Sequence, residues 1–224
     1  MATNFPGSLD SFTNPTSGST LDSPSHASQH ANINDAVEAL EAKVGVDGSA
    51  VTTSLDYKVA QQGLTLLARS AATSGTVLSF DNVFSSTFNV YRIAIVVNVT
   101  SAFGLQMRMR SGGSNDSSAN YRYVRTAYTY GGTLEQSYSA GDTKWNIPCI
   151  ASNNNAGGVL DVYNPYSANK TTYSGSGSDG RVGSGTGGLV GGGILNTNAS
   201  HDGFSLISST INSLIVSVYG YNNG

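Results

Sequence analysis

The spacing of apolar residues changes once along this chain, near residue 64. Before that point, between Ser23 and Gly48, apolar and histidine residues recur at alternating steps of four and three. The members of this series are His26, His30, Ile33, Val37, Leu40 and Val44. Such steps form the a/d seam of a coiled coil, so we predict a short helix over residues 23–48. Ser23 ahead of Pro24 suits the start of this helix, and Gly45 suits its C-terminal end.

From Leu64 onward, apolar and polar residues alternate with a period of two, and β-branched and aromatic residues are frequent. Clusters of Gly, Asn and Ser separate eight or nine such runs. This pattern predicts a mainly β protein with an antiparallel, jelly-roll-like β-sandwich over residues 64–224. Residues 93–99 are almost continuously apolar, which is typical of an interior strand, and the alternating run 213–221 ties the C-terminal end into a sheet.

Three shorter stretches lead to more local predictions. In residues 105–110, Leu, Met and Met alternate with Gln, Arg and Arg, so we expect the apolar set to face inward and the arginines to be solvated or to form a contact face. Residues 49–63 are predicted to be a neck in which Leu55, Tyr57 and Val59 alternate as a strand. The glycine-rich residues 174–193 are predicted to be a surface loop or a loosened edge strand.

Residues 1–22 form a polar segment with isolated apolar residues and no periodicity. One interpretation is a disordered tail. The other is an extended docking segment whose apolar side chains fill pockets on a larger assembly. Those side chains are Phe5, Leu9, Phe12 and Leu21.

A helix of so few turns is marginal alone in water, so it requires a partner. The partner is either the chain's own β-domain or further copies of the helix, and the a/d spacing favours a homotrimer. The trimerisation residues would be His30, Ile33, Val37, Leu40 and Val44. His26 and His30 extend the seam toward the N-terminus, where they could bind an anion or a metal, destabilise the assembly when protonated, or merely hydrogen-bond the start of the helix.

Composition excludes several classes of partner. Charged residues make up 11% of the chain and the net charge is −3, without any run of Lys or Arg, so nucleic-acid binding is not expected. No apolar stretch approaches the roughly 20 residues of a membrane-spanning helix, so we expect no membrane insertion. The first ten residues lack the features of a signal peptide. A neutral, hydroxyl-rich surface on a protein made in the host cytoplasm without export is typical of a virion component released by lysis.

Candidate chemistry is sparse. Among the three histidines, only His201 falls in the β-domain, and Cys149 has no histidine nearby in sequence to activate it. Asp142 and Asp161 are the carboxylates that could pair for glycoside hydrolysis. The sequence therefore predicts no enzyme activity, and no cofactor or metal ligand set.

Tyrosines are the residues most suited to surface recognition, because their rings offer rigid contact area beside amide and hydroxyl groups. The alternative is that half or more of them pack inside the sandwich. The candidates are Tyr121, Tyr123, Tyr128, Tyr130, Tyr166 and Tyr173.

The run from residue 14 to residue 59 resembles a segment near the N-termini of tailed-bacteriophage fibre and virion structural proteins. The matching features are SHASQH, NDAVEALEAKVGVDGS and TTSLDYKV. This resemblance implies a modular attachment and trimerisation unit that carries a distal β-rich domain.

Together these observations predict a short homotrimeric phage fibre, with a docking segment (1–22), a coiled-coil helix (23–48), a neck (49–63) and a β-sandwich head (64–224). Its partners would be its own copies, other virion proteins of the head or tail, and a host cell-surface glycan. The alternatives are a capsid decoration protein that stabilises the head and, less in keeping with the sparse carboxylates, a polysaccharide-degrading tailspike.

Overall fold

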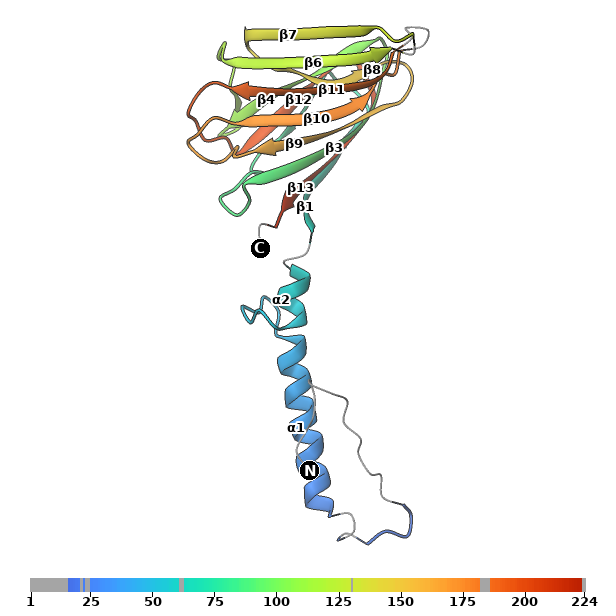
Figure 1. Cartoon of the computed structure of the whole chain (residues 1–224), viewed down its shortest axis with the longest axis vertical. Helices are drawn as coiled ribbons and strands as arrows, with labels where there is room; N and C mark the ends of the chain where they lie inside the picture. The colour runs from blue at the N-terminus through green and yellow to red at the C-terminus, as the bar shows by residue number, and fades with distance from the viewer. Residues whose placement is uncertain are drawn as a thin grey trace. The chain divides into compact units, whose positions relative to one another are not determined.

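The computed structural model describes residues 16–20, 22, 25–60, 63–129, 131–181 and 186–222. The chain divides between residues 62 and 63 into two compact units, which are described separately below. Figure 1 labels the helices of the first unit and most strands of the second.

The first unit, called here the helical unit, contains α1 (His26–Val44) and α2 (Leu55–Ala60). The predicted N-cap, Ser23, lies outside the described residues, and the described N-cap is Ser25, whose side chain accepts a hydrogen bond from the Ser28 N–H. Gly45 ends α1 with a φ of 87° and donates its N–H to the Glu41 carbonyl, as a C-terminal glycine should.

The predicted extended neck is wrong at residues 55–60, which form α2 instead of a strand. The Ser54 hydroxyl accepts the Tyr57 N–H and its carbonyl accepts the Lys58 N–H, so Ser54 caps a new helix. The alternation of Leu55, Tyr57 and Val59 covers too few residues to predict a strand, and the cap at Ser54 favours a helix instead.

The second unit, called here the head, consists of strands. Their bounds are β1 (Leu64–Ala72), β2 (Val77–Phe80), β3 (Val90–Val99), β4 (Phe103–Ser111), β5 (Ser114–Asn115), β6 (Tyr121–Thr129), β7 (Leu134–Asp142), β8 (Trp145–Ala151), β9 (Ala156–Tyr163), β10 (Thr172–Ser178), β11 (Thr186–Leu195), β12 (Gly203–Ile207) and β13 (Ile211–Tyr221). The described residues thus form more strands than the eight or nine predicted, because β5 is short, β7 is polar, and β10 and β11 are rich in glycine, so none of these four shows a clear apolar alternation.

The strands form two antiparallel sheets, which confirms the predicted β-sandwich. One sheet has eight strands in the order β1-β13-β3-β9-β10-β11-β6-β7, and the other has five, β2-β12-β4-β5 with β8 also paired to β4. Strands distant in sequence are neighbours, such as β3 (green) and β13 (red) in Figure 1. Interior positions of β3 and β13 agree with the prediction for residues 93–99 and 213–221.

The core lies between the two sheets and follows the alternation of the sequence. Leu105, Met107 and Met109 of β4 are fully buried, as predicted from residues 105–110. They pack in one cluster with inward-facing residues of β3, β13 and β12 and with Trp145 of β8. Burying a side chain of this size contributes roughly 1.5–3 kcal/mol, so this cluster is the main source of the head's stability.

The glycine-rich β10 and β11 are neither the predicted surface loop nor a loosened edge strand, because both are interior strands of the eight-stranded sheet. Their inward-facing positions include glycines, and β8 lies close beneath them. A Cβ on Gly177 would lie 2.0 Å from the Pro148 carbonyl oxygen, and one on Gly193 would lie 3.0 Å from the Trp145 ring. Glycine is therefore needed here for close approach of strand to strand.

Gly177→Ala should destabilise the head by about 2 kcal/mol or more, because β8 or β10 must move to admit the methyl group. Gly188→Ala is the matched control in β11, where a Cβ meets nothing within 4 Å. Urea denaturation of both variants measures the free energy of unfolding. Equal stability of the two variants would show that β8 does not lie this close to the sheet.

Candidate functional site

The predicted seam lies on α1 and is exposed to solvent in the single chain. Ile33, Val37, Leu40 and Val44 are each between 46% and 51% exposed. In α2, Leu55 and Val59 are also exposed and lie one helical turn apart. Among the described residues of the helical unit only Asn32 and Ser54 are buried, and both are polar. The described part of this unit therefore has no apolar core of its own.

The loop between α1 and α2 is held by specific contacts. The Ser54 hydroxyl donates to the Val51 carbonyl at 2.8 Å, and the Ser49 N–H donates to Asp56 Oδ2 at 2.9 Å. A Cβ on Gly45 would lie 2.8 Å from the Ser54 Cβ, so glycine is required by close packing as well as by its φ. These contacts fix the end of α1 against the start of α2.

His26 and His30 lie one turn apart at the start of α1 and face each other. Their Nε2 atoms are 3.1 Å apart, and their ring centroids are 4.4 Å apart in an edge-to-face arrangement. Both rings are exposed. The two Nε2 atoms are therefore within hydrogen-bond distance, and one imidazole donates to the other.

The predicted docking side chains Phe5, Leu9, Phe12 and Leu21 lie outside the described residues, as does Tyr130. The docking role stays a prediction.

The tyrosine prediction is wrong for three of the candidates. Tyr121, Tyr123 and Tyr173 are buried, because they occupy inward-facing positions of β6 and β10, and Tyr121 and Tyr173 pack against Trp145. Burial raises the pKa of the Tyr121 and Tyr173 hydroxyls, which keeps them protonated. Tyr128 and Tyr166 are exposed, and so is Tyr138 of β7.

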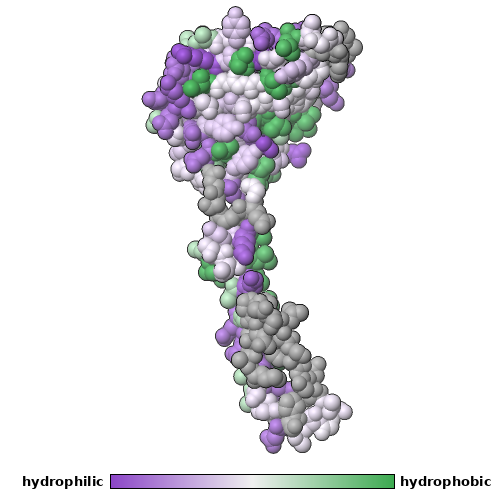
Figure 2. All heavy atoms as spheres, in the orientation of Figure 1, coloured by the Kyte–Doolittle hydropathy of each residue, from purple (hydrophilic) through white to green (hydrophobic). Residues whose placement is uncertain are grey.

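The outward face of the eight-stranded sheet is covered by small and apolar side chains. Paired residues on antiparallel strands point to the same face, so the register places one row across six strands. This row consists of Ser217, Ala94, Val159, Ser176, Val190 and Thr126. Val96, Val124, Val159 and Val190 on this face are exposed. Figure 2 shows hydrophobic residues (green) interspersed with near-neutral (white) and hydrophilic (purple) ones over the head.

Two shallow depressions of about 560 and 690 Å³ lie on this face and share Val159 and Ser176. They exist because the neighbouring positions are glycine, serine or alanine, whose side chains leave the sheet surface open. We call this face, from Arg69 on β1 across to Tyr138 on β7, the outer face.

One charged cluster borders the outer face. Arg92 of β3 donates two hydrogen bonds to Asp161 of β9, each 2.9 Å long, and the Tyr221 hydroxyl donates to the same carboxylate at 3.2 Å. The Asp161 carboxylate raises the pKa of the Arg92 guanidinium through these hydrogen bonds. The ion pair adds one bidentate, charge-neutral polar group to a face that also carries Arg69.

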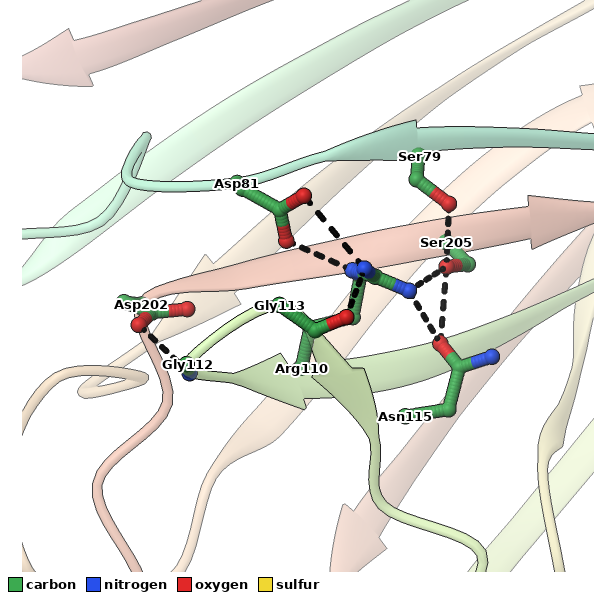
Figure 3. Close-up of polar contacts among 8 residues, drawn as sticks. All are labelled: Ser79, Asp81, Arg110, Gly112, Gly113, Asn115, Asp202 and Ser205. Atoms are coloured by element: carbon green, nitrogen blue, oxygen red, sulfur yellow. Dashed lines mark hydrogen bonds and ion pairs between the residues drawn. The ribbon is translucent and has the colours of Figure 1, made fainter.

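A second polar cluster ties four strands of the smaller sheet together (Figure 3). Arg110 of β4 binds Asp81, which follows β2, with its Nε 2.7 Å from Oδ1. Its Nη1 donates to Asn115 of β5 at 3.0 Å and to Ser205 of β12 at 3.2 Å. The Arg110 side chain is only 11% exposed, so it is neither a solvated charge nor a contact surface, which corrects both interpretations drawn from the alternation.

Arg110→Met should lower the free energy of unfolding by about 2 kcal/mol or more, because Asp81, Asn115 and Ser205 lose a charged hydrogen-bond partner. Arg122→Met, at an exposed position of β6, is the matched control and should change stability by less than about 0.5 kcal/mol. Chemical denaturation of the two variants tests this. A loss no greater than in the control would mean that the cluster contributes nothing to folding.

The groups considered for catalysis are dispersed or occupied. Asp142 of β7 and Asp161 of β9 are separated by β10, β11 and β6, which is about 19 Å at the usual strand spacing. Glycoside hydrolysis needs carboxylates within about 10 Å of each other, so this pair cannot act together. Burial raises the pKa of Cys149 to about 12, which keeps the thiol protonated.

His201 is buried, and its Nε2 lies 3.3 Å from Asp116 Oδ2. Partial burial raises the pKa of Asp116, but hydrogen bonds from Ser118 and His201 outweigh it and leave the pKa below its usual value. This arrangement stabilises a carboxylate beneath a loop. Sequence spacing could not reveal the contact, since 85 residues separate the two groups.

Within the part of the chain that the structure describes, no three His, Cys, Asp or Glu side chains of one chain come together as a metal site. In the same residues, no helix has both the length and the apolar character needed to cross a bilayer.

No protein-family model and no curated protein matches this chain. Among solved structures, a fructofuranosidase variant from Schwanniomyces occidentalis in complex with fructosylnystose aligns with 70% of this chain at 5% identity and a TM-score of 0.21. The alignment covers 34% of that enzyme, and the TM-score is too low to support an argument about fold or activity.

Proposed function

We propose that this protein is a structural component of a tailed-phage virion, a short homotrimeric fibre that carries three β-sandwich heads. The observation that supports it most is the helical unit, whose described apolar side chains line up on α1 and lie in water in the single chain. Three copies would bury these side chains against one another, with α1 as the stalk.

An isolated α1 would be less stable than α1 packed against other copies. A helix of 19 residues is marginal in water without a packed face. Ile33, Val37, Leu40 and Val44 would form four successive layers of a trimer at alternating a and d positions. The resemblance of residues 14–59 to phage attachment segments supports the same assembly, with residues 1–22 as the docking segment.

Leu40→Asp should convert the trimer to a monomer, because three carboxylates would meet at one layer of the seam. Ala42→Asp is the matched control, since Ala42 is exposed on α1 two residues away and off the seam. Sedimentation equilibrium of wild type and both variants gives the mass in solution. A wild-type monomer, or a trimer that survives Leu40→Asp, would contradict the seam as the basis of assembly.

The outer face is the surface of the head best suited to host attachment. Its exposed valines, hydroxyl groups and rim tyrosines, Tyr128 and Tyr138, offer apolar contact beside hydrogen-bonding groups, which suits the alternating faces of sugar rings. The depressions are shallow, so each head would bind a glycan weakly. Three heads on one stalk would raise the avidity through effective concentration.

Wild-type protein added to susceptible cells should protect them from infection, and the double variant Val124→Glu, Val190→Glu should lose at least about tenfold of that protection. The new carboxylates would add charge to the centre of the outer face without entering the core. Ser117→Glu, at an exposed position that follows β5, is the control. Plaque counts at graded protein concentrations measure the effect.

Two results would contradict this assignment. Equal protection by the double variant would exclude the outer face as the attachment surface. Absence of protection by the wild type, together with particles that burst more readily when they lack the protein, would instead identify a capsid decoration role.

A further inference from the structure

We infer that His26 and His30 form a site for a divalent first-row transition-metal ion, shared by three chains at the N-terminal end of the α1 bundle. The complete site rests on the proposed trimer. Each chain already holds its own third of the ligand set, and the structure shows that pair of imidazoles.

The distance between the two imidazoles fits a chelate. Two nitrogens bound to one ion lie about 3.0 Å apart in octahedral and about 3.4 Å apart in tetrahedral geometry, for metal–nitrogen bonds of about 2.1 Å. The Nε2 atoms of His26 and His30 are 3.1 Å apart. A single ion can therefore bind both rings with little rearrangement, once both carry their proton on Nδ1.

The position of the pair on the helix directs it toward the bundle axis. His26 and His30 continue the four-and-three steps of Ile33, Val37, Leu40 and Val44, so they occupy the next d and a positions. In a parallel trimer six imidazoles would converge above the Ile33 layer. Six nitrogens from three bidentate pairs complete an octahedral shell around one ion.

The residues of α1 around His26 and His30 suit a metal site whose ligands are neutral imidazole nitrogens. The first turn of α1 holds no acidic residue, and Lys43 in the last turn is the only Lys or Arg of the helix. No ammonium or guanidinium of α1 would therefore repel an ion at its N-terminal end. Imidazole without carboxylate favours Zn²⁺, Ni²⁺, Co²⁺ or Cu²⁺ over Mg²⁺ or Ca²⁺.

Such an ion would link the three chains at the end where the seam lacks apolar side chains. The four apolar layers hold the rest of α1, so metal removal should loosen the N-terminal turns and leave the trimer intact. This separates the contribution of the ion from that of the apolar seam.

The test uses full-length protein freed of metal with chelator and titrated with Zn²⁺, with bound zinc measured by calorimetry and elemental analysis. We expect one zinc ion per three chains. His26→Gln and His30→Gln should each weaken binding at least about tenfold. Ser28→Gln, exposed on α1 between the two histidines, is the control and should bind zinc as the wild type does. Sedimentation of all samples should show trimers with and without zinc.

Three results would overturn this inference: no zinc uptake, uptake that both histidine variants retain, or one ion per chain in a trimer, which would mean that the chains bind metal separately. The proposed function fails differently. A trimer that binds no zinc contradicts only the metal site, whereas a wild-type monomer in sedimentation contradicts the fibre and the shared site together.

Discussion

The head depends on how closely β8 lies beneath the eight-stranded sheet. Trp145 fills the centre of the core, and the Pro148 carbonyl oxygen occupies the space that a Cβ at Gly177 would need. A larger residue in place of Gly177 or Gly193 would push β8 or its neighbours away from the sheet and disturb the packing around Trp145. Inward glycines of β10 and β11 such as Gly177 and Gly193 are therefore a packing requirement of the sandwich, although the glycine-rich composition of these strands alone is typical of a flexible loop.

The same stretch explains the shape of the outer face. Residues alternate between the two sides of a strand, so the inward glycines of β10 leave Ser174 and Ser176 pointing outward. Val159 on β9 and Val190 on β11 flank Ser176, and they lie beside positions with little or no side chain. Tight packing on the inside thus accompanies a smooth, open surface on the outside. A sheet with larger outward side chains would have no depressions there.

The sequence predicted the elements whose pattern is long and unambiguous. The helix, the alternation of residues 105–110 and the interior positions of β3 and β13 follow from periods that extend over several residues. The predictions from sequence were wrong where a single contact decides the structure. Ser54 caps α2 within a segment whose residues alternate with a period of two. Arg110 is held in a hydrogen-bond network with Asp81 and Ser205. Three tyrosines face inward because of the register of their strands. The His26–His30 contact was accessible from the spacing, but its 3.1 Å separation was not.

The two units differ in whether their apolar side chains are buried within one chain. The head buries its apolar residues between two sheets of one chain, so it can fold without a partner. The described part of the helical unit buries none, so α1 requires a partner for its stability. A single copy therefore combines a head with its own core and a helical unit that lacks one. In the fibre that we propose, three heads would share one stalk, so weak contacts on a shallow outer face would be enough for attachment without a deep pocket.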